Sequence, residues 1–185
     1  MNWNMATYKL KMLLLGAAAV GKTSLIQNFI KGKFQKEYKM TIGTDIFTKD
    51  LVVKLDGEEI PVTLSIWDIA GQERFSFFRT SFYKGASGAM MVFDLTRYET
   101  FNPGIVNWLK ELWGFTGKIP ICIIGNKNDL EKYRAVRDND AEKFAKKIPC
   151  EYIETSAKTG DHVENSFYTI ALEMVKMMKK KDKSA

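Results

Sequence analysis

Residues 16–23 have the sequence Gly16-Ala17-Ala18-Ala19-Val20-Gly21-Lys22-Thr23, which fits the pattern G-x-x-x-x-G-K-[ST]. A short apolar run before it, residues 10–15, predicts a buried strand. After it, the apolar residues between 22 and 30 recur at helical spacing. In that context, backbone N–H groups and a helix N-terminus form a cradle for phosphate. The stretch therefore predicts a phosphate-binding loop.

Two side chains of this loop indicate a nucleotide with a metal ion. Lys22 can reach the outer phosphates, and the Thr23 hydroxyl can bind Mg²⁺, which prefers oxygen ligands. One alternative is a plain strand–turn–helix with a fortuitous Gly-Lys-Thr. Another is a secretory signal, because Lys9 and Lys11 precede the apolar residues 12–20. The complete pattern in its strand–helix context favours the phosphate loop over both.

The remaining chain alternates predicted strands and helices. Further strands are expected at residues 46–55, 60–69, 89–95, 119–125 and 151–154, and helices at 101–112, from 138 and from 161. Asp56-Gly57 indicates a hairpin, and Pro61 suggests that its second strand begins near an edge. The order predicts an α/β domain with a P-loop NTPase fold. Its mixed six-stranded sheet would be mostly parallel, with one antiparallel edge strand and helices on both faces.

Several residues are candidates for helix boundaries. Gly32 is expected to end the first helix, and Thr100 and Asp138 are expected to cap the N-termini of later ones. Asp161 and Glu164 resemble a capping box at the start of the last helix.

Polar residues at the carboxyl ends of parallel strands predict the ligand site. Gly16, Asp68, Asp94 and Asn126 are expected on this one rim of the sheet. Next to the rim, the two carboxylate oxygens of Asp129 match the N1–H and N2–H₂ donors of guanine, which adenine lacks.

Other residues near Asp129 complete the predicted base site. Asn126 can tie this loop to the phosphate loop, and the alkyl stem of Lys127 can cover the base. The N–H of Ala157, in Glu154-Thr155-Ser156-Ala157-Lys158, can donate to guanine O6. These segments could also be an ordinary polar loop and a helix-entry loop.

A second set of residues predicts a sensor of the γ-phosphate. Asp68 is placed to hold Mg²⁺, Gly71 to approach the γ-phosphate and Gln72 to orient the attacking water. Thr41 follows residues 31–40, whose polar character and weak periodicity predict a mobile loop, and it could bind Mg²⁺ only when a third phosphate is present. Two loops held by one phosphate form a switch, because hydrolysis removes the tether.

Composition narrows the class of protein. The 185 residues, 45% hydrophobic, suit one globular domain, and no apolar run approaches the about 18 residues of a spanning helix. Cys122, Cys150 and His162 are too few for a disulfide framework or a four-ligand zinc site, which favours a reducing, cytoplasmic compartment. The net charge of +6 arises largely from Lys176, Lys179, Lys180, Lys181 and Lys183.

In these motifs the chain resembles a Ras-superfamily small GTPase, and the Rab family is most similar, over residues 8–178. The Rab-like segments are Ile42-Gly43-Thr44-Asp45, Trp67-Asp68-Ile69-Ala70-Gly71-Gln72-Glu73-Arg74-Phe75, Phe82-Tyr83-Lys84-Gly85-Ala86 and Phe93-Asp94-Leu95-Thr96. The resemblance implies the small G-protein fold, GTP and GDP with Mg²⁺, and GTP hydrolysis. It also implies a switch of Rab type in membrane traffic or related regulation.

The resemblance also implies the site residues. The catalytic residues would be Gln72 and Lys22, and the metal ligands Thr23, Thr41 and Asp68. The nucleotide would be bound by Gly16, Ala18, Ala19, Val20, Gly21, Lys22, Thr23, Ser24, Phe34, Tyr38, Thr41, Gly71, Asn126, Lys127, Asp129, Ser156, Ala157 and Lys158.

Protein partners are implied in the same way. An effector, an exchange factor and a GTPase-activating protein would bind near residues 41–46 and 67–82 of a monomer. Ile46, Trp67 and Phe82 take the positions of the family's effector-binding aromatic triad, although core packing explains the two aromatic residues equally well.

The chain departs from the family pattern at two places. Ala18 and Ala19 stand where Gly, Ser or Thr and then Gly are usual, and a methyl group near the γ-phosphate predicts slow hydrolysis. The usual C-terminal prenylatable cysteines are absent, so the sequence is either truncated or not prenylated. The lysines there could contact anionic lipid weakly at the cytoplasmic face of a membrane, or could be solvated.

The expected organisation is an N-terminal extension (1–7), a G domain (8–178) and a lysine-rich flexible tail (179–185). Three competing functions remain beside the hydrolysing switch. A slowly hydrolysing nucleotide-bound adaptor is favoured by Ala18 and Ala19, whereas Asp129 argues against an ATP-dependent kinase. A nucleic-acid binder is suggested by net charge alone, so no nucleic-acid partner is predicted.

Overall fold

The computed structural model describes residues 8–32, 43–71 and 79–183, and its elements follow the predicted order. The strands are β1 (Tyr8–Leu15), β2 (Thr44–Leu55), β3 (Glu58–Ile69), β4 (Gly88–Asp94), β5 (Ile121–Asn126) and β6 (Glu151–Thr155). The α-helices are α1 (Lys22–Lys31), α3 (Tyr98–Phe101), α4 (Gly104–Thr116), α5 (Asp138–Lys147) and α6 (Val163–Asp182), and the 3₁₀ helices are η2 (Thr80–Phe82) and η3 (Asn128–Tyr133).

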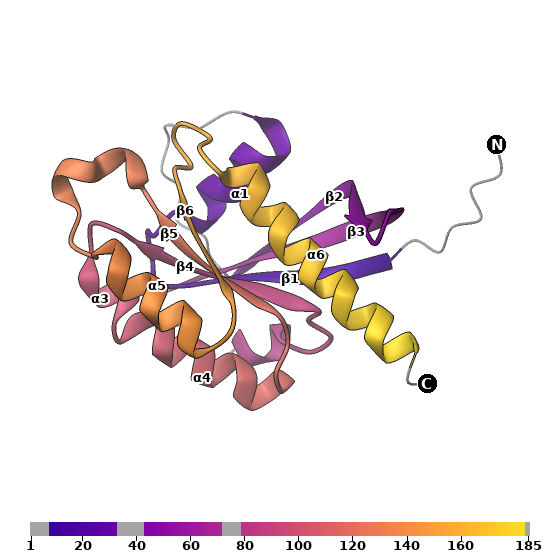
Figure 1. Cartoon of the computed structure of the whole chain (residues 1–185). Helices are drawn as coiled ribbons and strands as arrows, with labels where there is room; N and C mark the ends of the chain where they lie inside the picture. Colours follow the sequence, from indigo (N-terminus) through magenta and orange to yellow (C-terminus); the bar gives the residue numbers. More distant parts are fainter. Residues whose placement is uncertain (1–7, 33–42, 72–78, 184–185) are drawn as a thin grey trace.

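All six strands join one sheet in the order β2-β3-β1-β4-β5-β6 (Figure 1). Only the β2–β3 pair is antiparallel, from Thr44 opposite Ile69 to Leu55 opposite Glu58. The predicted α/β class, with one antiparallel edge strand on an otherwise parallel sheet, is confirmed. Asp56 and Gly57 have φ angles of 53° and 82°, which is the backbone of a tight hairpin turn.

Pro61 lies in β3 opposite Val52, and pairing of β3 with β1 begins only at Val62. Pro61, which has no backbone N–H, therefore lies where β3 pairs with β2 alone, one residue before pairing with β1 begins.

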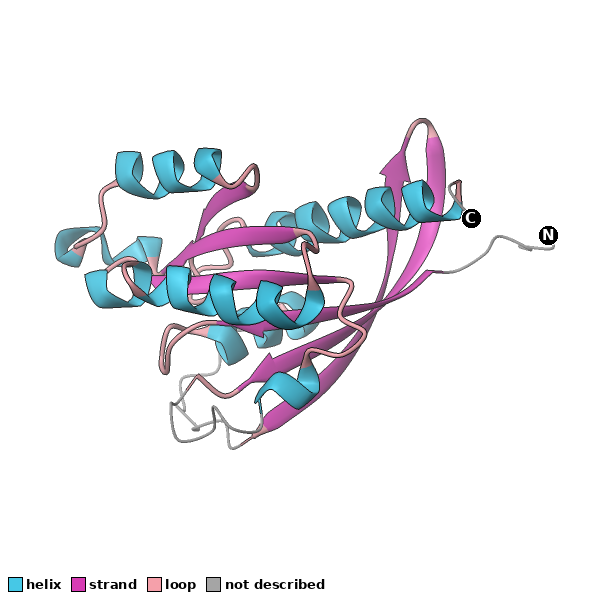
Figure 2. Cartoon of the chain, turned by 90° about the horizontal axis from the view of Figure 1, so that it is seen from below, coloured by secondary structure: helices cyan, strands magenta, loops and turns pink. Residues whose placement is uncertain are grey.

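Helices cover both faces of the sheet, as predicted. In Figures 1 and 2, α1 and α6 lie on one face and α3, α4 and α5 on the other. The side chains of β1 alternate between the two cores: Leu10, Met12 and Leu14 pack toward α1 and α6, and Leu13 and Leu15 toward the opposite helices. A strand buried on both faces reads as a continuous apolar run, which explains why residues 10–15 identified it.

Helix boundaries were predicted less well. Gly32 ends α1 with φ 62°, as expected. Thr100 is not an N-cap, because it lies inside α3, where its hydroxyl donates to the Arg97 carbonyl oxygen at 2.7 Å. The cap of α5 is Arg137, and Asp138 is already helical.

The capping box at the start of α6 was also wrong. The cap is His162, and Asp161 instead accepts a 2.6 Å hydrogen bond from the side-chain amide of Asn128.

The last helix continues beyond the predicted domain end. Residues 179–182 were expected in a flexible tail, but they form the final turn of α6, which packs beside the β2–β3 hairpin (Figure 2). Lys179 Nζ lies 2.5 Å from Glu58 Oε2, and the Tyr8 hydroxyl donates to Asp182 Oδ2 at 2.9 Å. Across the described residues, none of the helices combines the length and the apolar character needed to span a bilayer.

Candidate functional site

The phosphate loop connects the end of β1 to the start of α1, as its motif predicts. Two of its glycines are required by close approach. A Cβ on Gly16 would lie 2.1 Å from the Val92 carbonyl oxygen, and one on Gly21 would lie 2.2 Å from Asn126 Nδ2. Their φ angles of 147° and 102° are also positive, a region that side chains disfavour. Val20 is fully buried between these glycines, and Ser24 lies in the first turn of α1.

Lys22 folds back over its own loop. The buried ammonium donates to the carbonyl oxygens of Gly16 at 2.8 Å and Ala17 at 2.9 Å. These are two of the three bonds that an ammonium can donate. Burial lowers the pKa of Lys22 to about 8, although the nearby Asp68 carboxylate opposes this shift. The loop thus holds a costly buried cation, which a phosphate group would stabilise.

Gly71 lies directly against the same loop. A Cβ there would be 2.3 Å from the Gly16 carbonyl oxygen and 2.4 Å from the Ala17 carbonyl carbon, so only glycine allows this approach. The residue predicted to meet a γ-phosphate is therefore next to the predicted phosphate cradle.

Thr23 and Asp68, two of the three predicted metal ligands, lie in contact. The Thr23 hydroxyl donates to Asp68 Oδ2 from the first turn of α1 to the end of β3. A hydroxyl and a buried carboxylate beside a phosphate cradle form the oxygen-rich donor set that Mg²⁺ prefers. The residues present therefore fit this ion.

Asn126, at the end of β5, joins three segments of the site. Its Nδ2 donates to the Val20 carbonyl oxygen at 2.9 Å, and its Oδ1 accepts from Thr155 Oγ1 and from the Ala157 amide, both at 3.1 Å. The predicted tie between the base loop and the phosphate loop is present. The amide of Ala157, however, was expected to point at a base, and here it is directed to Asn126.

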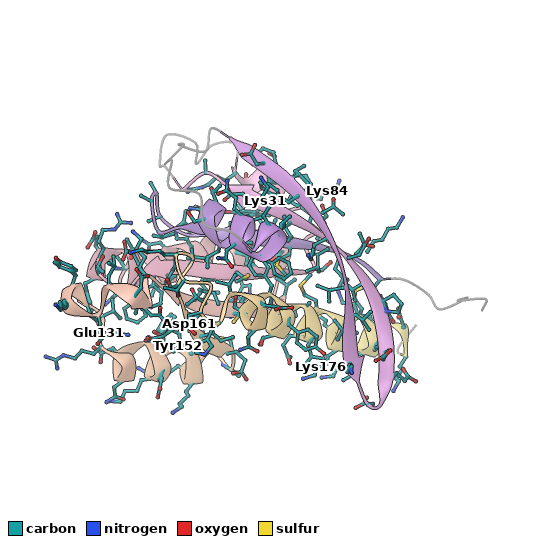
Figure 3. All side chains as sticks on the ribbon, turned by 90° about the horizontal axis from the view of Figure 1, so that it is seen from above. Lys31, Lys84, Glu131, Tyr152, Asp161 and Lys176 are labelled. Carbon is teal, nitrogen blue, oxygen red and sulfur yellow. The ribbon has the colours of Figure 1, made fainter. Side chains whose placement is uncertain are left out.

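The carboxylate of Asp129 is held by two residues of the loop that follows β6, Ser156 and Lys158. Its Oδ1 accepts a 2.6 Å hydrogen bond from Ser156 Oγ, and Lys158 Nζ lies 3.9 Å from its Oδ2. In Figure 3, Glu131 and Asp161 lie at this end of the molecule, whereas Lys176 lies toward the other end, beside the β2–β3 ribbon. The base-loop residues 126–129 and the loop of residues 156–158 are thus brought together.

Asp94, at the end of β4, forms ion pairs with two cationic side chains. Its Oδ2 lies 2.6 Å from Lys127 Nζ and 3.1 Å from Arg97 Nε, while its Oδ1 accepts from the Thr96 amide and hydroxyl. Burial would raise the pKa of Asp94, but the hydrogen bonds from Lys127 and Thr96 outweigh it and lower the pKa. Lys127 is therefore anchored by its ammonium.

Sequence reasoning placed Asp94 on the rim but missed Arg97. The guanidinium of Arg97 also donates to the Ala18 carbonyl oxygen at 2.9 Å. The close spacing of Asp94, Thr96 and Arg97 was the available signal, but it carries no information about the distant phosphate loop.

Four predicted site residues lie outside the described part of the chain: Phe34, Tyr38, Thr41 and Gln72. The three proposed effector positions are described. Ile46 pairs with Trp67 across β2 and β3, and the Trp67 and Phe82 ring centroids are 6.0 Å apart. Ile46 is 56% exposed, while the two aromatic side chains are half-buried against the core. Trp67 and Phe82 thus pack against the core and are also partly exposed at the surface beside Ile46.

Comparison with known proteins agrees with the geometry. Residues 11–176 match the family model described as "Ras family". The Ras-related protein RABA4b of Arabidopsis thaliana is 42% identical over 176 residues, covering 95% of this chain and 76% of the relative. The Ras-related protein Rab11C of Nicotiana tabacum is 39% identical over 179 residues, covering 96% and 78%. The Ras-related protein RGP1 of Oryza sativa subsp. japonica is 39% identical over 176 residues, covering 95% of this chain and 76% of the relative.

Proposed function

Because this chain belongs to the Ras family of small GTPases, we propose that it is a Rab-like switch that recruits effectors in its GTP state and acts in membrane traffic or related regulation. The chain is a GTPase of this family, with GTP or GDP and Mg²⁺ as its ligands. The effector role and the pathway are the proposed part.

In this proposal each group of site residues has its own role. Lys22 and the amides of residues 18–23 bind the phosphates, and Thr23 and Asp68 hold Mg²⁺, which neutralises phosphate charge when bound. Asp129 selects guanine, with its carboxylate oriented by Ser156. Water attacks the γ-phosphate in line with the leaving oxygen, so positioning and charge stabilisation supply most of the catalysis. Gln72 is proposed to orient that water.

One observation supports the proposal most strongly, namely the set of bonds that Asn126 makes. A single buried side chain contacts the phosphate loop through Val20 and the base-side loop through Thr155 and Ala157. The phosphate-binding and base-selecting parts are thus held at a fixed separation, as recognition of one whole nucleotide requires.

We propose the surface around Ile46, Trp67 and Phe82 for effectors, an exchange factor and an activating protein. Lys11 lies over the Trp67 ring, 3.7 Å from its centroid, so the patch is both aromatic and cationic. We further propose a monomer at the cytoplasmic face of membranes, with the lysines near the end of α6 attracted to anionic lipid. Binding of a candidate effector to the GTP-analogue and GDP forms tests the switch, and equal binding to both would reject it.

The identity of the nucleotide that co-purifies with the protein tests the base assignment. We expect guanosine phosphates. Asp129→Asn replaces an acceptor by a donor, which suits the C2 carbonyl of xanthine, so affinity should shift from GDP toward XDP. A mutant that still prefers GDP would refute the role of Asp129. Asp161→Asn, on the same side of the molecule, is the matched control and should keep the preference for GDP.

A slowly hydrolysing adaptor is the second candidate, and Ala18 and Ala19 are the observation that favours it. Ala18 is half-buried in the loop, and Ala19 has φ 60°. Single-turnover GTP hydrolysis with and without cell extract separates the two. A rate that extract does not raise favours the adaptor.

A further inference from the structure

Arg97 connects the phosphate loop to the carboxylate that also anchors the base loop. Its guanidinium donates from Nη2 to the Ala18 carbonyl oxygen at 2.9 Å and from Nε to Asp94 Oδ2 at 3.1 Å. The same Asp94 oxygen accepts from Lys127 Nζ at 2.6 Å. The planar guanidinium fork can make both bonds at once, because its donors point in fixed, different directions.

The carbonyl that Arg97 holds belongs to the peptide before Ala19. Ala19 has φ 60°, a left-handed conformation that glycine adopts readily and alanine does not. An unrestrained alanine would relax toward negative φ by rotating the Ala18–Ala19 peptide. That rotation would turn the Ala18 carbonyl and the Ala19 N–H together, and so remove one N–H from the phosphate cradle.

We propose that Arg97 is a positioning residue that holds the Ala18–Ala19 peptide in its binding orientation and thereby compensates for alanine at a left-handed position. Because Arg97 is itself fixed by Asp94, the restraint on the phosphate loop shares an anchor with Lys127 of the base loop. This inference rests on the proposed function in one respect: one of the two measurements that test it is the rate of nucleotide release.

The proposal predicts that Arg97 and position 19 act non-additively. In the natural background, Arg97→Ala should speed GDP release by about tenfold or more, the effect expected for a lost charge-assisted hydrogen bond. With glycine at position 19 the peptide needs no restraint, so adding Arg97→Ala to Ala19→Gly should speed release less than about threefold. The four proteins form one double-mutant cycle. Arg137→Ala removes the same side chain from the exposed start of α5 and is the matched control.

Amide hydrogen exchange over residues 16–23 gives a second measurement that needs no hydrolysis. Arg97→Ala should raise exchange in the natural background and leave it nearly unchanged with Ala19→Gly. Equal acceleration in both backgrounds, or none in either, would overturn the inference. If the unmodified protein retained no guanine nucleotide, the proposed function would fail, and the exchange data would still decide the role of Arg97.

Discussion

Asn126 donates from its side-chain amide to the carbonyl oxygen of Val20, 106 residues earlier in the chain, over 2.9 Å. Both residues are buried, so water cannot replace this bond when it is lost. The relationship fixes the base-side loops against the phosphate loop.

Asn126→Ala should lower GDP affinity by at least about a hundredfold, because it leaves the Val20 carbonyl, the Thr155 hydroxyl and the Ala157 amide without their partner. Asn128→Ala removes the same side chain from an exposed pair with Asp161 and should change affinity less than about threefold. Equilibrium titration with a fluorescent nucleotide measures both. Similar losses in the two variants would contradict the role given to Asn126.

Ala18→Gly should hydrolyse GTP faster than the natural protein, because it removes a methyl group from the loop beside the predicted γ-phosphate position. The natural rate is expected near or below the scale of about 10⁻⁴ to 10⁻³ per second known for intrinsic Ras hydrolysis. Single-turnover hydrolysis measures the difference. An unchanged or slower rate would reject the steric explanation, and unaltered GDP affinity in the variant would show that the loop still binds.

Nucleotide binding should take up a proton above pH 8. Burial lowers the pKa of Lys22 to about 8, and an adjacent phosphate would raise it again. At pH 9 much of the nucleotide-free protein therefore has a neutral Lys22 that becomes protonated on binding, so GDP affinity falls as pH rises from 8. Calorimetry at pH 9 in two buffers of different ionisation enthalpy should show uptake of up to about one proton, and at pH 7 almost none.

The lowered pKa of Lys22 also makes the free energy of unfolding depend on pH. Between pH 8 and the ordinary lysine value of 10.5, the unfolded chain binds more protons at this residue than the folded one, so its contribution to the free energy of unfolding rises with pH. Lys22→Arg stays charged throughout and should lose the proton uptake. Identical heats in both buffers for the natural protein at pH 9 would disprove the assignment.

Arg79 and Glu111 form a mostly buried ion pair beneath η2. Arg79 Nη2 lies 3.0 Å from Glu111 Oε2, its guanidinium carbon is 4.1 Å from the Trp108 ring centroid, and the Tyr83 hydroxyl donates to Glu111 Oε1 at 2.5 Å. Glu111→Gln keeps an acceptor for Tyr83 but leaves the arginine charge unpaired. It should cost about 3 kcal/mol of unfolding free energy, measured by urea unfolding at saturating GDP and Mg²⁺.

A second substitution tests whether the lost charge partner is the cause. Arg79→Met combined with Glu111→Gln removes the unpaired charge and should recover most of the loss. Costs that simply add in the double variant would show that the charge pairing is not what stabilises this cluster.

The sheet could be predicted because its signals are local. A continuous apolar run such as residues 10–15 identifies a strand buried on both faces, and Asp56-Gly57 identifies the hairpin. Helix starts were predicted poorly because capping residues also have other partners. Asp161 has the right spacing for a capping box, but its carboxylate is used by Asn128, and the chain enters α6 through His162 at φ 51° instead.

The candidate site was predictable where a motif specifies geometry. The phosphate-loop pattern fixes where Lys22 and Thr23 stand relative to a strand and a helix, and the end of β5 fixes Asn126. Arg97 could not be found in this way. Its contact with Ala18 spans 79 residues and depends on how the ends of β1 and β4 lie side by side, which no local pattern encodes.

Helix α6 has 20 residues, so it is about 30 Å long. It starts beside the base-side loops and finishes against the turn of the β2–β3 hairpin, where Lys179 meets Glu58. Any segment that continues the chain beyond Lys183 therefore starts at the far end of a rigid helix, away from the base-side loops of the proposed nucleotide site. A membrane contact there and a protein bound near the base-side loops would lie at opposite ends of α6.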